Sequence, residues 1–163
     1  MIPRACAVPR DALLSRYVAQ EGVYTDCFEV MHPGPVDLPA MIEAFYTTGL
    51  FRIERLVLSV GLRRRITVRQ VQALAQGGAS AFAAWEVEAR EESQILLRDL
   101  SGATRSWLAA APKEGAATRL LFGSAVVPRQ GRTLGPGFRL LVPLHRAYAR
   151  ALLRAAEWRL RRG

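Results

Sequence analysis

The chain has 163 residues and a mass of 18.0 kDa, half of its residues are hydrophobic, and its formal charge is +9. This length suits one domain with a sizeable core, and the composition excludes a disordered chain. No apolar run approaches the length of a membrane span, and residues 1–8 lack the apolar region of a signal peptide. We therefore expect a single cytoplasmic domain over residues 1–163.

The first half of the chain predicts one strand and several helices. Alternation predicts a strand over residues 24–31, with Tyr24, Asp26 and Phe28 on one face. Asp37 is a suitable N-cap for the helix that follows, and Thr67 is a suitable cap for another. The predicted helices cover residues 12–20, the stretch from 38 to the glycine at 49, residues 51–61 and residues 68–75.

The second half predicts strands and then one long helix. Short turns rich in glycine and proline separate strand-like runs at 82–91, 94–100, 104–111 and 116–127, which indicates an antiparallel meander. A helix is predicted over 138–162, with arginines opposite an apolar line that includes Tyr148 and Leu152. Pro143 should kink this helix or delay its start. Strands and helices that occur in runs indicate the α+β class.

Three short motifs occur along the chain in a recognisable order. They are Tyr24-Thr25-Asp26-Cys27-Phe28, Ala44-Phe45-Tyr46-Thr47-Thr48 and Pro143-Leu144-His145-Arg146. With the order of elements, over roughly residues 8–159, they resemble a bacterial family of unknown function in the SRPBCC superfamily, the START and birch-pollen-allergen helix-grip proteins. The resemblance implies a curved, mainly antiparallel sheet that grips helix 138–162. The bias toward arginine and alanine also suits a GC-rich bacterial genome.

The resemblance also implies a cavity between the sheet and the last helix, for a small apolar or amphipathic ligand. If side chains fill this space and leave no void above roughly 300 Å³, simple ligand binding loses its basis. Arg139 and Arg146 are expected to bind an anionic end of the ligand. Ordinary core packing is the alternative for the aromatic candidates, and no cofactor is expected. The candidates for the cavity walls are Trp85, Trp107, Phe122, Leu141 and Tyr148.

A polyketide cyclase or dehydratase-like enzyme is a second hypothesis, and it depends on analogy of fold. Asp26 and His145 would form its acid/base pair, with the pKa of Asp26 raised by the aromatic residues beside it. Each residue also has a structural interpretation. His145 would anchor the helix start by a hydrogen bond, and Asp26 would form a salt bridge with Arg146 or Arg119. The sequence leaves it uncertain whether the protein is an enzyme.

The remaining charged and sulfur-containing residues suggest little further chemistry. Arginines at 63–65 and near the C-terminus favour association with anionic lipid or nucleic acid, but no stacking aromatics accompany them, so no specific nucleic-acid site is expected. Cys6 and Cys27 lack metal-ligand spacing, and no metal site is expected. No oligomeric state can be inferred. Cross-strand charge pairs are expected among Glu86, Glu88, Arg98, Arg105 and Arg119.

Overall fold

A computed structural model describes residues 1–48, 67–82, 84–128 and 133–162 of the chain. Among these residues, seven strands form one antiparallel sheet in the order β1-β2-β7-β6-β5-β4-β3. The predicted helix 51–61 and the arginines at 63–65 lie outside the described residues. The strands are β1 (Arg4–Ala5), β2 (Tyr24–His32), β3 (Ala81–Phe82), β4 (Trp85–Arg90), β5 (Gln94–Asp99), β6 (Thr104–Pro112) and β7 (Thr118–Val126).

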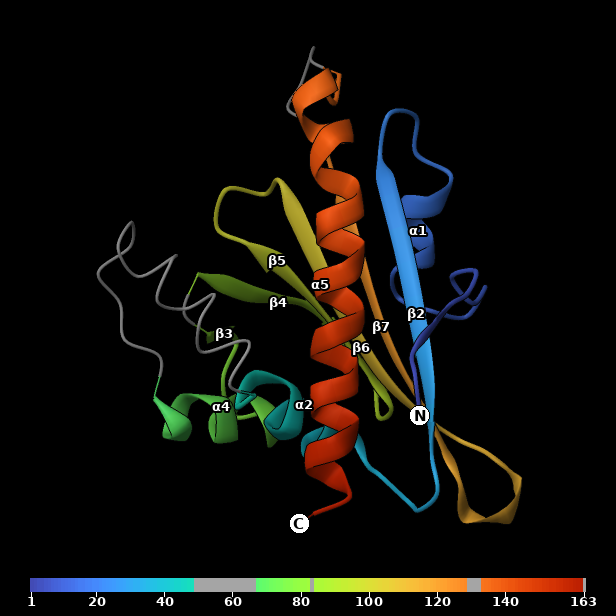
Figure 1. The fold of residues 1–163 in the computed structure, drawn as a ribbon. Helices are drawn as coiled ribbons and strands as arrows, with labels where there is room; N and C mark the ends of the chain where they lie inside the picture. The colour runs from blue at the N-terminus through green and yellow to red at the C-terminus, as the bar shows by residue number, and fades with distance from the viewer. Residues whose placement is uncertain (49–66, 83, 129–132, 163) are drawn as a thin grey trace.

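The helices lie mainly on one side of this sheet, and α5 runs along its length (Figure 1). Asp37 caps α2 by accepting a hydrogen bond from the backbone of Ala40 at 2.8 Å, as predicted. Thr67 and Gln70 form a capping box at the start of α4, so both predicted caps are confirmed. The helices are α1 (Ser15–Val18), α2 (Leu38–Tyr46), α4 (Val68–Ala75), the 3-10 turn η1 (Glu114–Ala116) and α5 (Pro136–Leu160).

α5 runs alongside β2 in the same direction. The ring of Phe138 packs edge-on against Tyr24 at the start of both elements, with centroids 5.3 Å apart. Near the other end of both elements, Oε1 of Glu157 lies 3.6 Å from Nδ1 of His32. A helix rises about 1.5 Å and a strand about 3.3 Å per residue, so both segments span roughly 27 Å. The α+β helix-grip arrangement is therefore confirmed.

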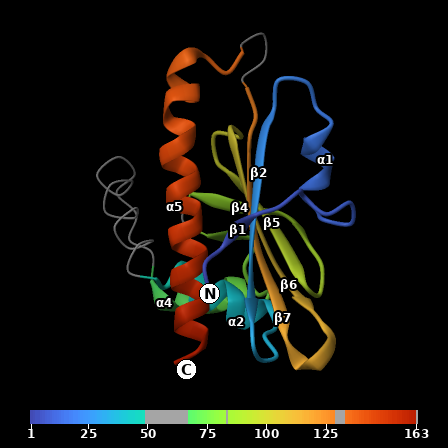
Figure 2. The ribbon, with the colours of Figure 1, turned by 45° about the vertical axis from the view of Figure 1, so that its right-hand side comes forward.

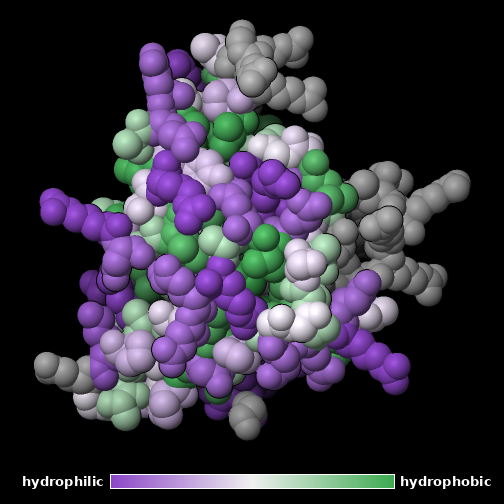
Figure 3. All heavy atoms as spheres, turned by 180° about the vertical axis from the view of Figure 1, so that it is seen from behind, coloured by the Kyte–Doolittle hydropathy of each residue, from purple (hydrophilic) through white to green (hydrophobic). Residues whose placement is uncertain are grey.

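The sheet separates two cores, because successive side chains on a strand point to opposite faces. Phe28, Leu108 and Phe122 face α5 and join the larger core with α2 and α4. Cys27 and Leu121 face the other way, into a smaller core covered by α1. Figure 2 shows α5 and α1 on opposite sides of the sheet. On the face behind α5, hydrophilic side chains surround scattered apolar patches (Figure 3).

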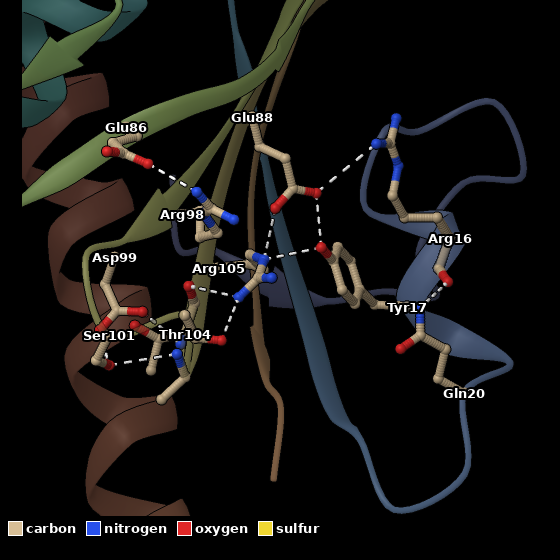
Figure 4. A network of polar contacts seen from close by, with 12 residues as sticks. Arg16, Tyr17, Gln20, Glu86, Glu88, Arg98, Asp99, Ser101, Thr104 and Arg105 are labelled. Atoms are coloured by element: carbon tan, nitrogen blue, oxygen red, sulfur yellow. Dashed lines mark hydrogen bonds and ion pairs between the residues drawn. The ribbon is translucent and has the colours of Figure 1, made fainter. Parts of the chain in front are cut away.

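A polar network ties α1 to the sheet on this second face (Figure 4). The Tyr17 hydroxyl donates to Glu88 at 2.6 Å, and Arg105 donates to the same carboxylate at 2.7 Å. The predicted pairing of Glu88 with Arg105 and of Glu86 with Arg98 is confirmed. Arg119 instead forms an ion pair with Glu29 of β2. Burial and the bond to Glu88 raise the pKa of Tyr17.

Several local predictions differ from the structure. Alternation along the run 82–91 predicts that Trp85, Val87 and Ala89 share one face, but the register of β4 shifts between Val87 and Ala89, so Ala89 faces the smaller core. Pro143 lies within α5, which begins at Pro136 and so before the predicted start. The helix predicted at 12–20 is only the four residues of α1. Among the described helices, none is long and apolar enough to cross a membrane.

Candidate functional site

A cavity of about 220 Å³ lies between α5 and the strands β4, β6 and β7. Aromatic and aliphatic side chains make most of its wall, and a smaller polar side contains Ser106, Ser124 and His145. The hydroxyl oxygens of Tyr46 and Ser106 are 3.5 Å apart. This combination of apolar walls and a few convergent polar groups is typical of a small-molecule site. The apolar wall includes Phe45, Trp85, Phe122, Tyr148 and Leu152.

Three of the predicted wall residues line this cavity, namely Trp85, Phe122 and Tyr148. Trp107 does not, and its predicted position in the wall is wrong. On β6 the residues on either side of Trp107 face α5, so its own side chain enters the smaller core. There it is 2% exposed, and its indole nitrogen donates to Gln94 at 2.9 Å.

The helix residues expected at the cavity mouth also lie elsewhere. Leu141 is 58% exposed and is not among the lining residues. Arg139 is exposed and is also absent from the lining. Arg146 points to the β2 side of α5, where its guanidinium carbon is 5.9 Å from the centre of the Phe28 ring. Neither arginine contributes to the polar side of the cavity.

Asp26 and His145 come together at the polar side of the cavity, although they are far apart in the sequence. Nε2 of His145 lies 3.3 Å from Oδ2 of Asp26 and 2.9 Å from the hydroxyl oxygen of Ser124. Ser124 donates to Oδ1 of Asp26 at 2.5 Å, and Tyr24 donates to Oδ2 at 3.0 Å. Because Ser124 gives its one proton to Asp26, the proton between Ser124 and His145 belongs to Nε2. The structural interpretation of His145 as an anchor for the helix therefore agrees with this geometry.

This environment determines the charge of Asp26. Burial alone would raise its pKa, but the hydrogen bonds from His145, Ser124 and Tyr24 and the charge of His145 outweigh burial and lower it. The expectation of a raised pKa for Asp26 is therefore wrong, because its carboxylate accepts hydrogen bonds and is not surrounded by aromatic rings alone. Burial and the negative charge of Asp26 raise the pKa of Tyr24 to about 12. At neutral pH the cluster holds a carboxylate, a phenol and a hydroxyl.

The arrangement differs from a Ser-His-Asp triad. In a triad the serine and the aspartate bind opposite nitrogens of the imidazole, so that the aspartate orients the base. Here both contact the same nitrogen, Nε2, and Ser124 gives its proton to Asp26. Asp26 is 8% exposed and does not line the cavity, whereas Ser124 and His145 do. The cluster is suited to hold hydrogen-bonding groups at the cavity wall.

A larger hollow of about 750 Å³, which no sequence pattern predicted, lies at the other end of the sheet. It lies between the loop after β2, the β6–β7 hairpin and the end of α5, and its lining includes His32, Ser93 and Leu160. The segments that line this hollow are far apart in the sequence, so no local pattern could predict it. Among the described residues, no group of three or more His, Cys, Asp or Glu side chains could hold a metal ion.

Comparison with known proteins finds similarity only among solved structures. No family model matches the chain, and no curated protein matches it. The chain is similar to Ara h 8.0201, with 12% identity and a TM-score of 0.40 over 85% of this chain and 99% of that one. It is also similar to TTHA0849 from Thermus thermophilus, with 13% identity and a TM-score of 0.28 over 83% of this chain and 96% of that one. The helix-grip assignment therefore depends on the strand order and the position of α5.

Proposed function

We propose that the protein binds a small, mainly apolar molecule in the cavity between the sheet and α5. The observation that carries this proposal is the aromatic wall of the cavity with one polar side. The prediction of a void above roughly 300 Å³ is wrong, because the cavity has a volume of about 220 Å³, and the proposal is therefore restricted to a correspondingly small ligand. Since a water molecule takes about 30 Å³ of liquid, the cavity suits a ligand of about seven non-hydrogen atoms. A drug-sized or sterol-sized ligand does not fit this volume.

The polar end of the ligand is proposed to meet Ser106, Ser124 and His145. These side chains line the cavity, whereas Arg139 and Arg146 do not. The carboxylate of Asp26 lies directly behind Ser124, at 2.5 Å from its hydroxyl. A second negative charge at this wall would be repelled, so a neutral hydroxyl group suits the site better than a carboxylate.

The cyclase or dehydratase-like alternative has less support in the geometry. It needs Asp26 and His145 to act on one substrate in a shared cavity. Asp26 accepts bonds from Tyr24, Ser124 and His145 and does not line the cavity. Its oxygens are occupied by these neighbours, which makes Asp26 a group that positions His145.

Binding of benzyl alcohol tests the leading proposal. We expect it to bind with a dissociation constant of about 0.1–10 mM, given its size, and to shift the NMR signals of Trp85 and Tyr148. Ser106→Leu fills the cavity and should weaken binding at least about tenfold. Ser93→Leu is the matched control, because Ser93 lines the other hollow. Equal binding by both variants would contradict the location of the site.

Benzoate distinguishes the two proposed positions for the polar end of the ligand. If Ser106, Ser124 and His145 hold it, benzyl alcohol should bind more tightly than benzoate, and Arg146→Met should change neither affinity. If Arg146 holds an anionic end, as the sequence suggested, benzoate should bind more tightly and should lose that advantage in Arg146→Met. Titrations of the wild type and this variant with both probes decide between the two positions.

A second candidate function, association with an anionic lipid surface, has one observation in its favour. Near the start of α5, Leu140 is 82% exposed and Leu144 is 69% exposed. Exposed arginines, Arg139 and Arg146, lie beside these leucines in the sequence. Apolar side chains interspersed with arginines on an exposed helix are typical of helices that lie in a membrane interface.

Vesicle pelleting tests this candidate. At about 50 mM salt the protein should sediment with vesicles that contain phosphatidylserine and not with pure phosphatidylcholine, and higher salt should release it. The double substitution Leu140→Gln with Leu144→Gln should reduce binding several-fold. Leu100→Gln is the control, since Leu100 is similarly exposed, at 57%, in the turn after β5. No sedimentation at low salt would remove this candidate.

A further inference from the structure

The two cysteines of the chain face one another across the edge of the sheet. The register of β1 and β2 pairs Arg4 with Glu29 and Ala5 with Phe28, and its continuation places Cys6 opposite Cys27. The backbone N–H of Cys6 donates to the carbonyl of Cys27 at 3.0 Å. Both thiols are free, and their sulfur atoms are 3.3 Å apart.

The two thiols differ in burial and in their neighbours. Cys27 is 3% exposed and belongs to the smaller core, whereas Cys6 is only partly buried. The hydrogen bond between the thiols lowers the pKa of Cys6 against the effect of burial, with help from the charge of Arg119. The same bond and burial raise the pKa of Cys27. Cys6 is therefore the accessible nucleophile, and Cys27 keeps its proton.

We propose that Cys6 and Cys27 are a redox-active pair that a small hydroperoxide oxidises to an intramolecular disulfide. Directly opposed residues in an antiparallel ladder have Cα atoms about 4.5–5.5 Å apart, within the range that a disulfide spans. The sulfur atoms need to approach from 3.3 Å to about 2.05 Å, which side-chain rotation can supply. A hydroperoxide is small enough to reach a thiol that is only partly buried.

The reaction has two steps. The Cys6 thiolate attacks one oxygen of hydrogen peroxide, the O–O bond breaks, an S–O bond forms, and the departing hydroxide takes a proton to become water. Cys27 sulfur then attacks the sulfenic sulfur of Cys6, the S–O bond breaks, and the second hydroxide leaves as water with the Cys27 proton. In total two thiols lose two electrons, and one peroxide is reduced to two waters.

The disulfide would join the N-terminal segment to β2 around the loop that contains α1 and its network with Glu88. Closing a loop of this length should raise the melting temperature of the domain by about 5–10 °C. Oxidation would thus tighten the face of the sheet opposite α5. The cavity lies on the other face, so this pair and the proposed ligand site can be tested separately.

Intact-mass spectrometry of the reduced protein after treatment with equimolar hydrogen peroxide tests this proposal. We expect a monomer that has lost two hydrogen atoms, no thiol that reacts with maleimide, and full recovery with dithiothreitol. In Cys27→Ala, peroxide should leave Cys6 as a sulfenic acid that dimedone traps. In Cys6→Ser, consumption of peroxide should be at least tenfold slower.

Two outcomes would overturn the redox pair. One is consumption of peroxide by Cys6→Ser at the wild-type rate. The other is oxidation of the wild type to sulfinic acid or to a disulfide-linked dimer in place of the intramolecular disulfide. A thermal melt of each reduced variant shows whether it folds. The pH dependence of the rate for Cys27→Ala gives a second readout, because loss of the Cys27 thiol should move the apparent pKa of Cys6 upward.

Discussion

Replacing Asp26 with asparagine is expected to destabilise the protein by about 2–4 kcal/mol at pH 7. The carboxylate is 8% exposed and accepts hydrogen bonds from Tyr24 and Ser124, with His145 3.3 Å away. An asparagine has one acceptor oxygen, so at least one of these donors would face an N–H group and remain unpaired. Urea unfolding followed by circular dichroism measures the loss.

The same substitution should change how stability depends on pH. The pKa of Asp26 in the folded protein lies below its unfolded value. The stability that ionised Asp26 contributes to the folded state is therefore fully present above about pH 4, and it is lost as the pH falls through the folded-state pKa. The difference between wild type and Asp26→Asn should shrink as the pH falls below about 4 and through the folded-state pKa of Asp26.

Asp11→Asn is the control for Asp26, because the Asp11 side chain is exposed. It should leave the free energy of unfolding within about 0.5 kcal/mol of wild type. Equal stability of Asp26→Asn and wild type at pH 7 would mean that the Asp26 cluster does not help to hold α5 on the sheet. A loss of stability that does not shrink at any pH below about 4 would mean that the ionised carboxylate is not its source.

Leu152→Ala is expected to cost about 2–5 kcal/mol of stability, since it removes a buried side chain from the contact between α5 and the sheet. Leu152 is 2% exposed and belongs to the larger core. It also lines the cavity, so its truncation should enlarge the proposed binding site. The melting temperature should fall by roughly 5–15 °C.

Leu144→Ala provides the matched control on the same helix. Leu144 is 69% exposed, so the same truncation should change the free energy of unfolding by less than about 0.5 kcal/mol. The ratio of the two effects measures how strongly one face of α5 is packed. Similar melting temperatures for Leu152→Ala and wild type would show that another face of the helix meets the sheet.

Local patterns predicted most elements because caps and periodicity act within a few residues. Thr67 with Gln70 defined the start of α4, and its predicted end at Ala75 agrees with the structure. Alternation predicted β2 to within one residue of its observed end. The two-residue strand β1 escaped prediction, because a segment that short has no period to detect. The single run predicted at 82–91 is divided into β3 and β4.

The candidate site was predicted only in part. Trp85, Phe122 and Tyr148 line the cavity, but Trp107 belongs to the smaller core. An apolar run such as β6 can bury both of its faces, so composition alone did not show which residues of that strand face α5. The polar contribution of Ser106 and Ser124 had no signal in the sequence, because a serine within a strand has no distinctive spacing.

Patterns in the sequence were enough to predict the fold class, the long amphipathic helix and the caps of α2 and α4, because they follow from the periodicity, the capping residues and the order of the segments. Long-range packing places Asp26 beside His145 and Cys6 beside Cys27, and it leaves a cavity of small volume. These features depend on strand register and on how α5 lies along β2. A shift of one residue in a strand turns its side chains to the other face, so long-range packing alone selects the partners.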